Sequence, residues 1–311
     1  MRLARSSAGG TMMTIAHIDP GTPPADVRAE AESLLAQDGA VLLRGFDIAD
    51  ADAFHRAVTC FGAPPLDSYR GGNTPRSSIS TGVFTSTEYP ARYEITLHNE
   101  MSYARQYPRR LFFGCLTPAE SGGATPVCSG RALLADLPAP VRDRFAELGV
   151  VYHQHLHGGA GLGKSWQDTF ETDDKSVVDE FLTGADARFE WTADGGLRVR
   201  QHRPGVLTHP DTGHAVWFNQ ADQWHPATLP DGEGDDLLSI VDGPEDLPHW
   251  VTYGDGSHIP AADLAAVRAA GDRNKLAVPW RRGDLMIVDN LAALHGRQPF
   301  TGSRKVVVSM T

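Results

Sequence analysis

The sharpest chemical pattern in the chain is His98-Asn99-Glu100, which directly follows the β-prone run over residues 93–97. On an extended chain, residues two apart point to the same side, so one imidazole and one carboxylate converge without a loop folding back. A second histidine, His295, stands just beyond the apolar run over 284–290, where the sequence predicts a turn. Two histidines and one carboxylate leave three positions of an octahedral ion open, as in non-haem Fe(II) oxygenases.

An isolated His-x-Glu is also typical of a hydrogen-bonded strand end, so the neighbouring segments matter. Arg304 lies nine residues after His295 and opens the β-prone run over 305–310. Beside a metal, an arginine can bind a carboxylate through its bidentate guanidinium. Thr125 ends a Gly-Gly-Ala-Thr segment and offers a hydroxyl to the same carboxylate.

Most of the chain resembles the TauD/TfdA family of Fe(II)- and 2-oxoglutarate-dependent oxygenases, and within it the SyrP-like members. The resemblance implies that His98, Glu100 and His295 bind iron, that Arg304 binds the distal carboxylate of 2-oxoglutarate, and that Thr125 assists Arg304. The segments that carry it are residues 97–103, 108–127, 209–220 and 281–310.

Two positions depart from the wider family. Most members have Asp where this chain has Glu100, although the SyrP-like branch is known to use glutamate. The gap from His295 to Arg304 is also shorter than in the taurine enzymes, which leaves Arg297 as a second candidate for binding 2-oxoglutarate. The related halogenases lack the carboxylate ligand altogether, so Glu100 argues against halogenation.

The elements that must position these residues are mostly short strands with helices at their edges, without a regular βαβ alternation. The resemblance implies a mainly β, α+β fold: a double-stranded β-helix (jelly roll, cupin-like barrel) with flanking helices and a helical and loop insert. Strands are predicted at 40–46, 93–97, 111–115, 150–155, 189–191, 197–200, 215–219, 285–289 and 305–310, and helices at 22–39, 51–61, 139–148, 175–182 and 259–270.

Residues 14–311 are predicted to form a single domain, in which residues 156–280 are an insert and outer strands between the metal-ligand segments. The polar residues 1–13 are expected to be a disordered lead-in outside the fold. Residues 70–90 are rich in Gly, Pro, Ser and Thr, and this composition predicts a long loop.

Composition excludes several classes of protein. The chain has 311 residues, of which 41% are hydrophobic and 22% are charged, as in ordinary globular proteins. The net charge of −11 and the absence of a basic run argue against a nucleic-acid partner. No apolar stretch approaches the roughly 18 residues of a membrane span. Three cysteines without disulfide or zinc spacing fit a reducing cytoplasm. The sequence is compatible with a homo-oligomer.

Other polar residues are weaker candidates for a site. Arg76 is preferred over Arg70 and Arg92 as a substrate contact, because Gly-Gly-Asn-Thr-Pro-Arg matches the SyrP-like pattern. Asn99 and Asn219 are further candidates for substrate contact, since each stands next to a predicted strand end.

His153, His155 and His157 are predicted to share one face of a strand, where they could bind a second metal. A polar strand end is the favoured interpretation, because the sequence places no carboxylate or cysteine beside them. The remaining histidines and large aromatic residues are expected to belong to loops, to the core or to insert packing; they are His209, His214, His225, Trp166, Trp217, Phe218 and Trp224.

The predicted function is oxidation, above all hydroxylation, of an sp3 C–H bond with Fe(II), 2-oxoglutarate and O₂. SyrP-like members commonly modify an amino acid, free or held on a peptidyl carrier protein. The resemblance therefore implies an amino-acid-type substrate in natural-product biosynthesis. Two alternatives are a catabolic oxygenase of a small organic acid or sulfonate, and a jelly-roll sensor that binds a metal or ligand without catalysis.

Overall fold

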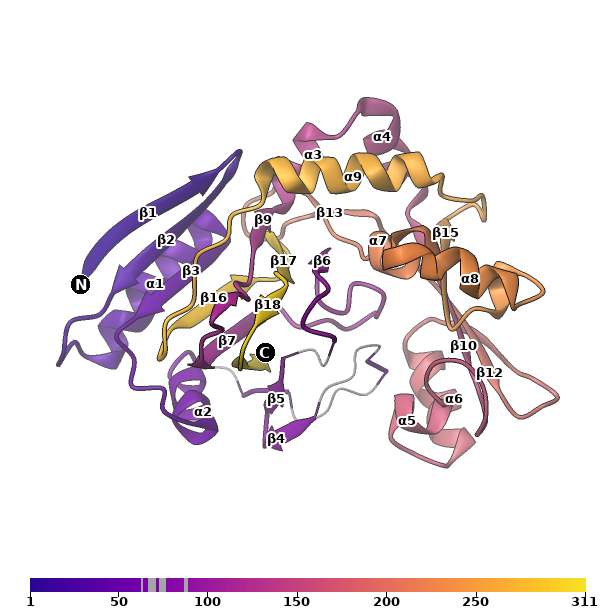
Figure 1. Ribbon diagram of the computed structural model, residues 1–311, viewed down its shortest axis with the longest axis horizontal. Coiled ribbons are helices and arrows are strands. Elements are labelled where there is room, and N and C mark those ends of the chain that lie inside the picture. Colours follow the sequence, from indigo (N-terminus) through magenta and orange to yellow (C-terminus); the bar gives the residue numbers. More distant parts are fainter. Residues whose placement is uncertain (63, 67–70, 73–76, 87–88) are drawn as a thin grey trace.

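The computed structural model describes residues 1–62, 64–66, 71–72, 77–86 and 89–311. Its largest element is an eight-stranded sheet (Figure 1). Its neighbouring strands are antiparallel, except that β2 and β3 run parallel. The strand order is β1 (Arg2–Ala8), β2 (Thr11–His17), β3 (Ala40–Arg44), β16 (Leu285–Asp289), β7 (Arg110–Thr117), β19 (Lys305–Met310), β5 (Val83–Thr85) and β4 (Ser78–Ser80).

The middle strands of this sheet are buried on both faces, and β16 is an example whose alternate side chains enter two different apolar clusters. Successive side chains of a strand point to opposite faces. Leu285 and Ile287 pack into an apolar cluster with helices α1 (Pro24–Asp38) and α2 (Ala51–Thr59). Met286 and Val288 pack into a second cluster on the other face. The two helices therefore cover one face of the sheet and leave the other face for the site.

A second, three-stranded sheet covers that other face. It has the order β6 (Ile95–His98), β17 (Ala293–Arg297) and β9 (Val127–Ser129), with antiparallel neighbours. Val127, Cys128 and Leu294 of this sheet belong to the same apolar cluster as Met286 and Val288. The two sheets thus enclose a common core. Two short strand pairs border them: β8 (Ser121–Gly122) with β18 (Phe300–Thr301), and β13 (Val206–Thr208) with β14 (Ala215–Trp217).

A four-stranded sheet lies at the lower right of Figure 1, and three of its strands belong to the predicted insert. Its order is β11 (Arg188–Trp191), β12 (Leu197–Arg203), β10 (Val150–Leu156) and β15 (His249–Tyr253). A separate apolar cluster joins it to α5 (Trp166–Phe170) and α6 (Lys175–Gly184), and Trp166, Phe170 and Leu182 are buried there. The insert therefore has a small core of its own.

The other helices pack around the edges of the sheets, and α9 crosses the top of the molecule in Figure 1. They are α3 (Gly130–Asp136), α4 (Ala139–Leu148), α7 (Ala221–Trp224), α8 (Glu233–Ser239) and α9 (Ala261–Asn274), with 3-10 turns at Pro226–Thr228, Pro230–Gly232 and Pro244–Asp246. Within the described residues, every helix is too short or too polar to cross a bilayer. The mainly β, α+β architecture with flanking helices is as predicted.

The N-terminal residues do not form the disordered lead-in that the sequence predicts. Residues 1–13 contribute β1 and the start of β2, which extend the large sheet. Thr11 and Met13 are almost completely buried, and the Thr11 hydroxyl accepts a hydrogen bond from the amide of Ser129 (2.8 Å). β1 is an exposed edge strand with polar residues, so its composition resembles that of a tail although its backbone is paired.

The predicted loop over 70–90 also contains secondary structure. β4 and β5 lie within it, and β5 pairs with the C-terminal strand β19. Val83 and Phe84 are buried, so two apolar residues within a polar stretch suffice to fix a short strand. Strand pairing between distant segments depends on tertiary contacts, which composition does not show.

Candidate active site

The two predicted metal-binding segments meet side by side. β6 ends at His98, and β17 pairs with it in a register that places His295 opposite His98. His295 therefore lies within a strand, and not at the turn that the sequence predicts. The ring centroids of the two histidines are 4.3 Å apart. Antiparallel pairing thus holds both imidazoles on one side of the small sheet.

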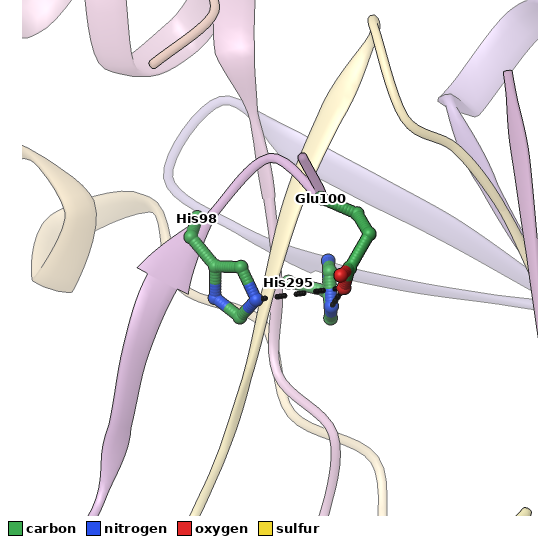
Figure 2. Close-up of side chains that lie close together, drawn as sticks. All are labelled: His98, Glu100 and His295. Atoms are coloured by element: carbon green, nitrogen blue, oxygen red, sulfur yellow. Dashed lines mark ion pairs between the residues drawn. The ribbon is translucent and has the colours of Figure 1, made fainter. Parts of the chain in front are cut away.

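Glu100 completes the group from the turn that follows β6 (Figure 2). Its Oε2 atom lies 3.9 Å from Nε2 of His98 and 3.7 Å from Nε2 of His295. All three residues are buried, with exposed fractions of 6% for His98, 3% for Glu100 and 4% for His295. Two imidazoles and a carboxylate that converge in a dry pocket are the donor set that Fe(II) takes in non-haem oxygenases.

Asn290, which the sequence analysis missed, fixes the backbone of Glu100. Its Oδ1 accepts a hydrogen bond from the Glu100 amide (2.7 Å), and its Nδ2 donates to the carbonyl oxygens of Glu100 and Pro108 (both 2.9 Å). The next residue, Met101, has a φ of +54°, which turns the chain sharply away from the strand direction. Asn290 therefore holds the turn that presents the carboxylate.

The orientation of the His98 ring is set by its other nitrogen. Nδ1 lies 2.9 Å from the carbonyl oxygen of Thr96 and 2.9 Å from the side-chain amide of Gln223, on α7. With Nδ1 engaged in this way, Nε2 faces Glu100. Metal-bound histidines almost always have such a partner on the second nitrogen, because it fixes the tautomer and the ring plane.

A cavity extends from these ligands to Arg304. His98 and His295 line one part of it, and Thr125 and Arg304 line another. Arg304 donates from Nε to the carbonyl oxygen of Gly123 (2.8 Å) and has an N–H within 3.5 Å of the Thr125 hydroxyl. Burial lowers the pKa of Arg304 to about 10, so the guanidinium remains charged at neutral pH. The cavity therefore has a metal-binding part and a cationic part.

Arg297, the second candidate for binding 2-oxoglutarate, lines the same cavity but has other partners. Its guanidinium nitrogens donate to the carbonyl oxygens of Tyr89, Pro90 and Tyr93 (each 2.8 Å). These bonds stabilise the segment that leads into β6. The geometry therefore favours Arg304 over Arg297 as the group that meets a ligand.

The structure does not place the candidate substrate contacts Asn99 and Asn219 on the cavity. Asn99 is fully buried and donates to the carbonyl oxygen of Asn290 (2.7 Å). Asn219 is buried too, and its amide bonds the backbone of Gly205 (2.9 Å) and Ala221 (3.1 Å). Both asparagines hydrogen-bond backbone segments, and neither is among the described residues that line the cavity.

The candidate arginines before β6 give no further site residue. Arg70 and Arg76 lie outside the described residues, so the structure does not test the preference for Arg76. Arg92 is exposed and packs over the ring of Tyr93, with 4.4 Å between its guanidinium carbon and the ring centroid. It lies away from the residues that line the cavity.

The three histidines around β10 do not form a metal-binding group among the described residues. His153 and His155 share the less buried face of the strand, but Nε2 of His153 contacts the Thr252 hydroxyl (3.1 Å), and Nδ1 of His155 contacts the carbonyl oxygen of Asp246 (3.2 Å). His157 follows the strand and accepts from the Gly159 amide (3.2 Å). Burial is confirmed for Trp166, Trp217, Phe218 and Trp224.

A second group of histidine and carboxylates was also missed. His209, Asp211 and Asp289 place ligand-type atoms within 4.8 Å of one another. No local pattern joins all three residues, because Asp289 ends β16 while His209 and Asp211 lie in the turn between β13 and β14. Nε2 of His209 contacts Oδ2 of Asp289 (3.2 Å), and Arg109 contacts both carboxylates.

A double-stranded β fold with two histidines and a carboxylate at one mouth defines the class of non-haem Fe(II) oxygenases. The family model "Taurine catabolism dioxygenase TauD, TfdA family" matches residues 11–311. This chain belongs to the TauD/TfdA family, and it is an Fe(II)- and 2-oxoglutarate-dependent oxygenase.

Two curated relatives are each 33% identical to this chain. The dapdiamide synthesis protein DdaC of Enterobacter agglomerans aligns over 279 residues, 90% of this chain and 84% of the relative. A clavaminate synthase-like protein of Arabidopsis thaliana aligns over 291 residues, 90% of this chain and 83% of the relative.

Solved structures support the jelly-roll fold. The structure of PvcB from Pseudomonas aeruginosa has a TM-score of 0.57 at 17% identity and covers 99% of this chain and 90% of its own. The structure of AAD-2 with Mn(II) and N-oxalylglycine has a TM-score of 0.55 at 14% identity and covers 100% of this chain and 97% of its own.

Proposed function

We propose that this oxygenase hydroxylates an sp3 C–H bond of an amino acid, or of an aminoacyl group held on a peptidyl carrier protein, in natural-product biosynthesis. The observation that carries the chemistry is the single cavity that joins His98 and His295 to Arg304. The relatives support the biosynthetic setting: DdaC is named for dapdiamide synthesis, and PvcB is described as an oxygenase from an isonitrile synthetic pathway.

In this proposal His98, Glu100 and His295 hold Fe(II). The iron supplies the activation of O₂, coupled to decarboxylation of 2-oxoglutarate to succinate and CO₂. Arg304 binds the distal carboxylate of 2-oxoglutarate through charge-assisted hydrogen bonds, with the Thr125 hydroxyl beside it. Burial of the three ligands keeps bulk water away from the reacting groups.

The surroundings of Arg304 support its role as an anchor. Its Nε–H is held by the Gly123 carbonyl, and one terminal nitrogen lies 3.2 Å from the Ser86 hydroxyl. A Cβ atom at Gly123 would lie 3.1 Å from Cδ of Arg304, so the glycine leaves room for this packing. The guanidinium is therefore placed before the ligand arrives, which reduces the entropy lost on binding.

Two properties outside the site belong to the same proposal. The partners are a small amino-acid-type molecule and a peptidyl carrier protein, and the chain is a candidate homo-oligomer. A cytoplasmic location fits Cys60, Cys115 and Cys128, all of which are free thiols.

The alternative within enzymes is a catabolic oxygenase of a small organic acid or sulfonate. It is favoured by the family description, which refers to taurine catabolism. Oxygen consumption measured with a panel of free amino acids, aminoacyl carrier proteins and sulfonates separates the two. Stimulation by sulfonates alone would contradict our proposal. A sensor without catalysis would consume no oxygen with any of these substrates.

The test of the site is anaerobic. Fe(II) and then 2-oxoglutarate are added to metal-free protein, and the weak visible charge-transfer band of the chelated complex is recorded. We expect the band in the wild type and in His155→Ala, whose side chain lies on β10 outside the lining of this cavity, and its loss in Arg304→Ala at 2-oxoglutarate concentrations that saturate the wild type. A band of equal strength in Arg304→Ala would overturn the assignment of the anchor.

A further inference from the structure

A second, larger cavity lies between the turn after Glu100 and the insert. Its volume is about 580 Å³. Met101, which directly follows the ligand Glu100, lines it together with Tyr103, and Phe170 and Phe181 line it from the insert. The lining of the cavity therefore starts at the residue that follows Glu100 in sequence and includes residues of β10 and β12, and it shares no described residue with the lining of the cavity at Arg304.

The floor of this cavity carries two amide side chains. Gln154 on β10 and Gln201 on β12 are diagonal neighbours, since Gln154 pairs with Val199 and Gln201 pairs with Tyr152. Both are buried, with exposed fractions of 5% and 7%. Two polar side chains at the bottom of a cavity with aromatic walls are typical of a binding site, in which a few polar groups fix the orientation of the ligand.

The two amides differ in how they are satisfied. Oε1 of Gln201 accepts a hydrogen bond from Arg203 (2.9 Å), which fixes that side chain. Nε2 of Gln154 has no hydrogen-bond partner within the described part of the chain. A buried donor left without a partner is destabilising, because nothing compensates for the loss of its hydrogen bond to water. The last torsion of a glutamine side chain is soft, so Gln154 can turn its amide to meet a carbonyl oxygen in the cavity.

The size of the cavity indicates the length of the ligand. Its volume lies within the roughly 300–1,000 Å³ of sites that enclose drug-sized molecules. A free amino acid would leave most of this space to water. A chain with secondary amides fits better, because its carbonyl groups can accept from the floor while its methylene groups lie against Phe170 and Phe181.

We propose that this cavity binds an amide-bearing arm of the substrate, and that Gln154 donates a hydrogen bond to a carbonyl oxygen of that arm. The inference rests on the proposed function and narrows it to elongated substrates. Such an arm has two chemical sources, the pantetheine of a carrier protein and the backbone of a peptide-like free substrate. Arg105 lines the same cavity and is exposed, so it can meet a phosphate or carboxylate at the outer end.

The test is anaerobic calorimetry on the full-length protein loaded with Fe(II) and 2-oxoglutarate. The probes are 4′-phosphopantetheine and N-acetyl-alanyl-alanine, with free alanine as the short control. We expect one of the two amide probes to bind and alanine to give no measurable heat. Which probe binds distinguishes the carrier arm from the peptide.

Two matched variants locate the bound probe. Gln154→Met keeps the length of the side chain but removes the amide, and we expect it to weaken binding fivefold to tenfold. Gln37→Met changes the same residue type at an exposed position on α1, outside the lining of this cavity, and should alter the affinity less than twofold. The charge-transfer band shows that each variant is folded. Equal affinity in Gln154→Met and wild type, or no binding of either amide probe, would overturn the inference.

Failure of this inference is distinguishable from failure of the proposed function. Hydroxylation of free amino acids at the same rate in wild type and Gln154→Met would support the proposed function and contradict the arm. Probe binding that depends on Gln154, together with turnover of sulfonates alone, would support the arm and contradict the proposed function.

Discussion

Two groups of histidine and carboxylate place ligand-type atoms close together near Asn290, which bonds the backbone of Glu100 and follows Asp289 in sequence. In the first, His98, Glu100 and His295 direct ligand atoms at one another inside a buried pocket. In the second, the Asp211 side chain is 73% exposed and contacts Arg109 (2.5 Å). Each group contains a His-x-acid pair, to which the first adds a second histidine and the second adds a second aspartate, and burial and neighbouring charge also differ.

The polar atoms of the second group form hydrogen bonds within the chain. Nδ1 of His209 accepts from the amides of Asp211 and Thr212 (both 3.3 Å), and Nε2 contacts Asp289. Oδ1 of Asp289 accepts from the amide of Leu291 (2.9 Å). Both ring nitrogens are thus used within the chain, and a cation already lies beside the carboxylates. Burial and the neighbouring arginine, more than the presence of histidine and carboxylate, therefore distinguish the two groups.

The largest expected effect separates the two groups directly. His98→Ala or His295→Ala removes one of the three proposed iron ligands, and we expect turnover to fall at least about 1,000-fold, or roughly 4 kcal/mol. Iron stoichiometry and oxygen consumption with 2-oxoglutarate measure the loss. His155→Ala is the control and should retain bound iron and activity. An equal loss in all three variants would contradict the assignment of the ligands.

A smaller effect is expected at Asn290, which lies between the two groups. Asn290→Leu removes the bonds that hold the backbone of Glu100, and partners outside the ligand shell typically contribute 10-fold to 100-fold to metal affinity. Anaerobic titration with Fe(II) measures the dissociation constant. Asn290→Asp keeps the acceptor for the Glu100 amide, so its loss should be intermediate. Unchanged affinity in Asn290→Leu would show that the turn holds its shape without this residue.

His209→Ala should affect stability and leave the metal site intact. The variant removes a buried imidazole that bonds Asp289 and two backbone amides, so we expect the free energy of unfolding to fall by about 1–3 kcal/mol. The dissociation constant for Fe(II) should stay within twofold of the wild-type value. Chemical denaturation and iron titration of the same sample test both statements. Loss of iron with unchanged stability would reverse the roles that we give to the two groups.

The smallest effect concerns His153, which has no carboxylate in hydrogen-bond contact. Burial, together with Arg200, lowers the pKa of His153 to about 4. The unfolded chain therefore binds a proton at His153 more readily than the folded protein does, and protonation favours unfolding. This loss of stability is absent above about pH 6.5, where the imidazole is neutral in both states, and it grows as the pH falls towards 4. Because the ring is partly exposed, His153→Gln should stabilise the protein at pH 5 by under about 1 kcal/mol, and have little effect at pH 8. Urea titrations at the two pH values measure the difference.

Sequence reasoning could predict the parts of the site that depend on local spacing. His98 and Glu100 are two residues apart at a strand end, and Arg304 directly precedes the last strand, so their placement follows from the local sequence. The pairing of His295 with His98 could not be read locally, because it joins segments almost 200 residues apart. For the same reason Asn290 and Gln223, which bond the ligand segments from other elements, were missed.

The fold shows the same division. The helix α1 and the buried strand β16 have clear apolar patterns and were predicted close to their observed positions. β1 and β5 were missed, since their strand character comes from pairing with β2 and β19 and not from their own composition. Asn99 and Asn219 bond backbone groups, because an amide beside a strand end can serve the backbone as well as a ligand.

The bonds from Asn290 to Glu100 have a consequence for how iron enters the protein. Conformational entropy is lost when the backbone of a turn is fixed. Here that entropy is lost during folding, because Asn290 fixes the turn through contacts within the chain. The affinity for iron is therefore not reduced by the cost of ordering a disordered segment. Binding of Fe(II) then requires only that protein ligands replace water on the ion, because the site is already formed. The sheets are therefore expected to stay folded when iron binds or dissociates.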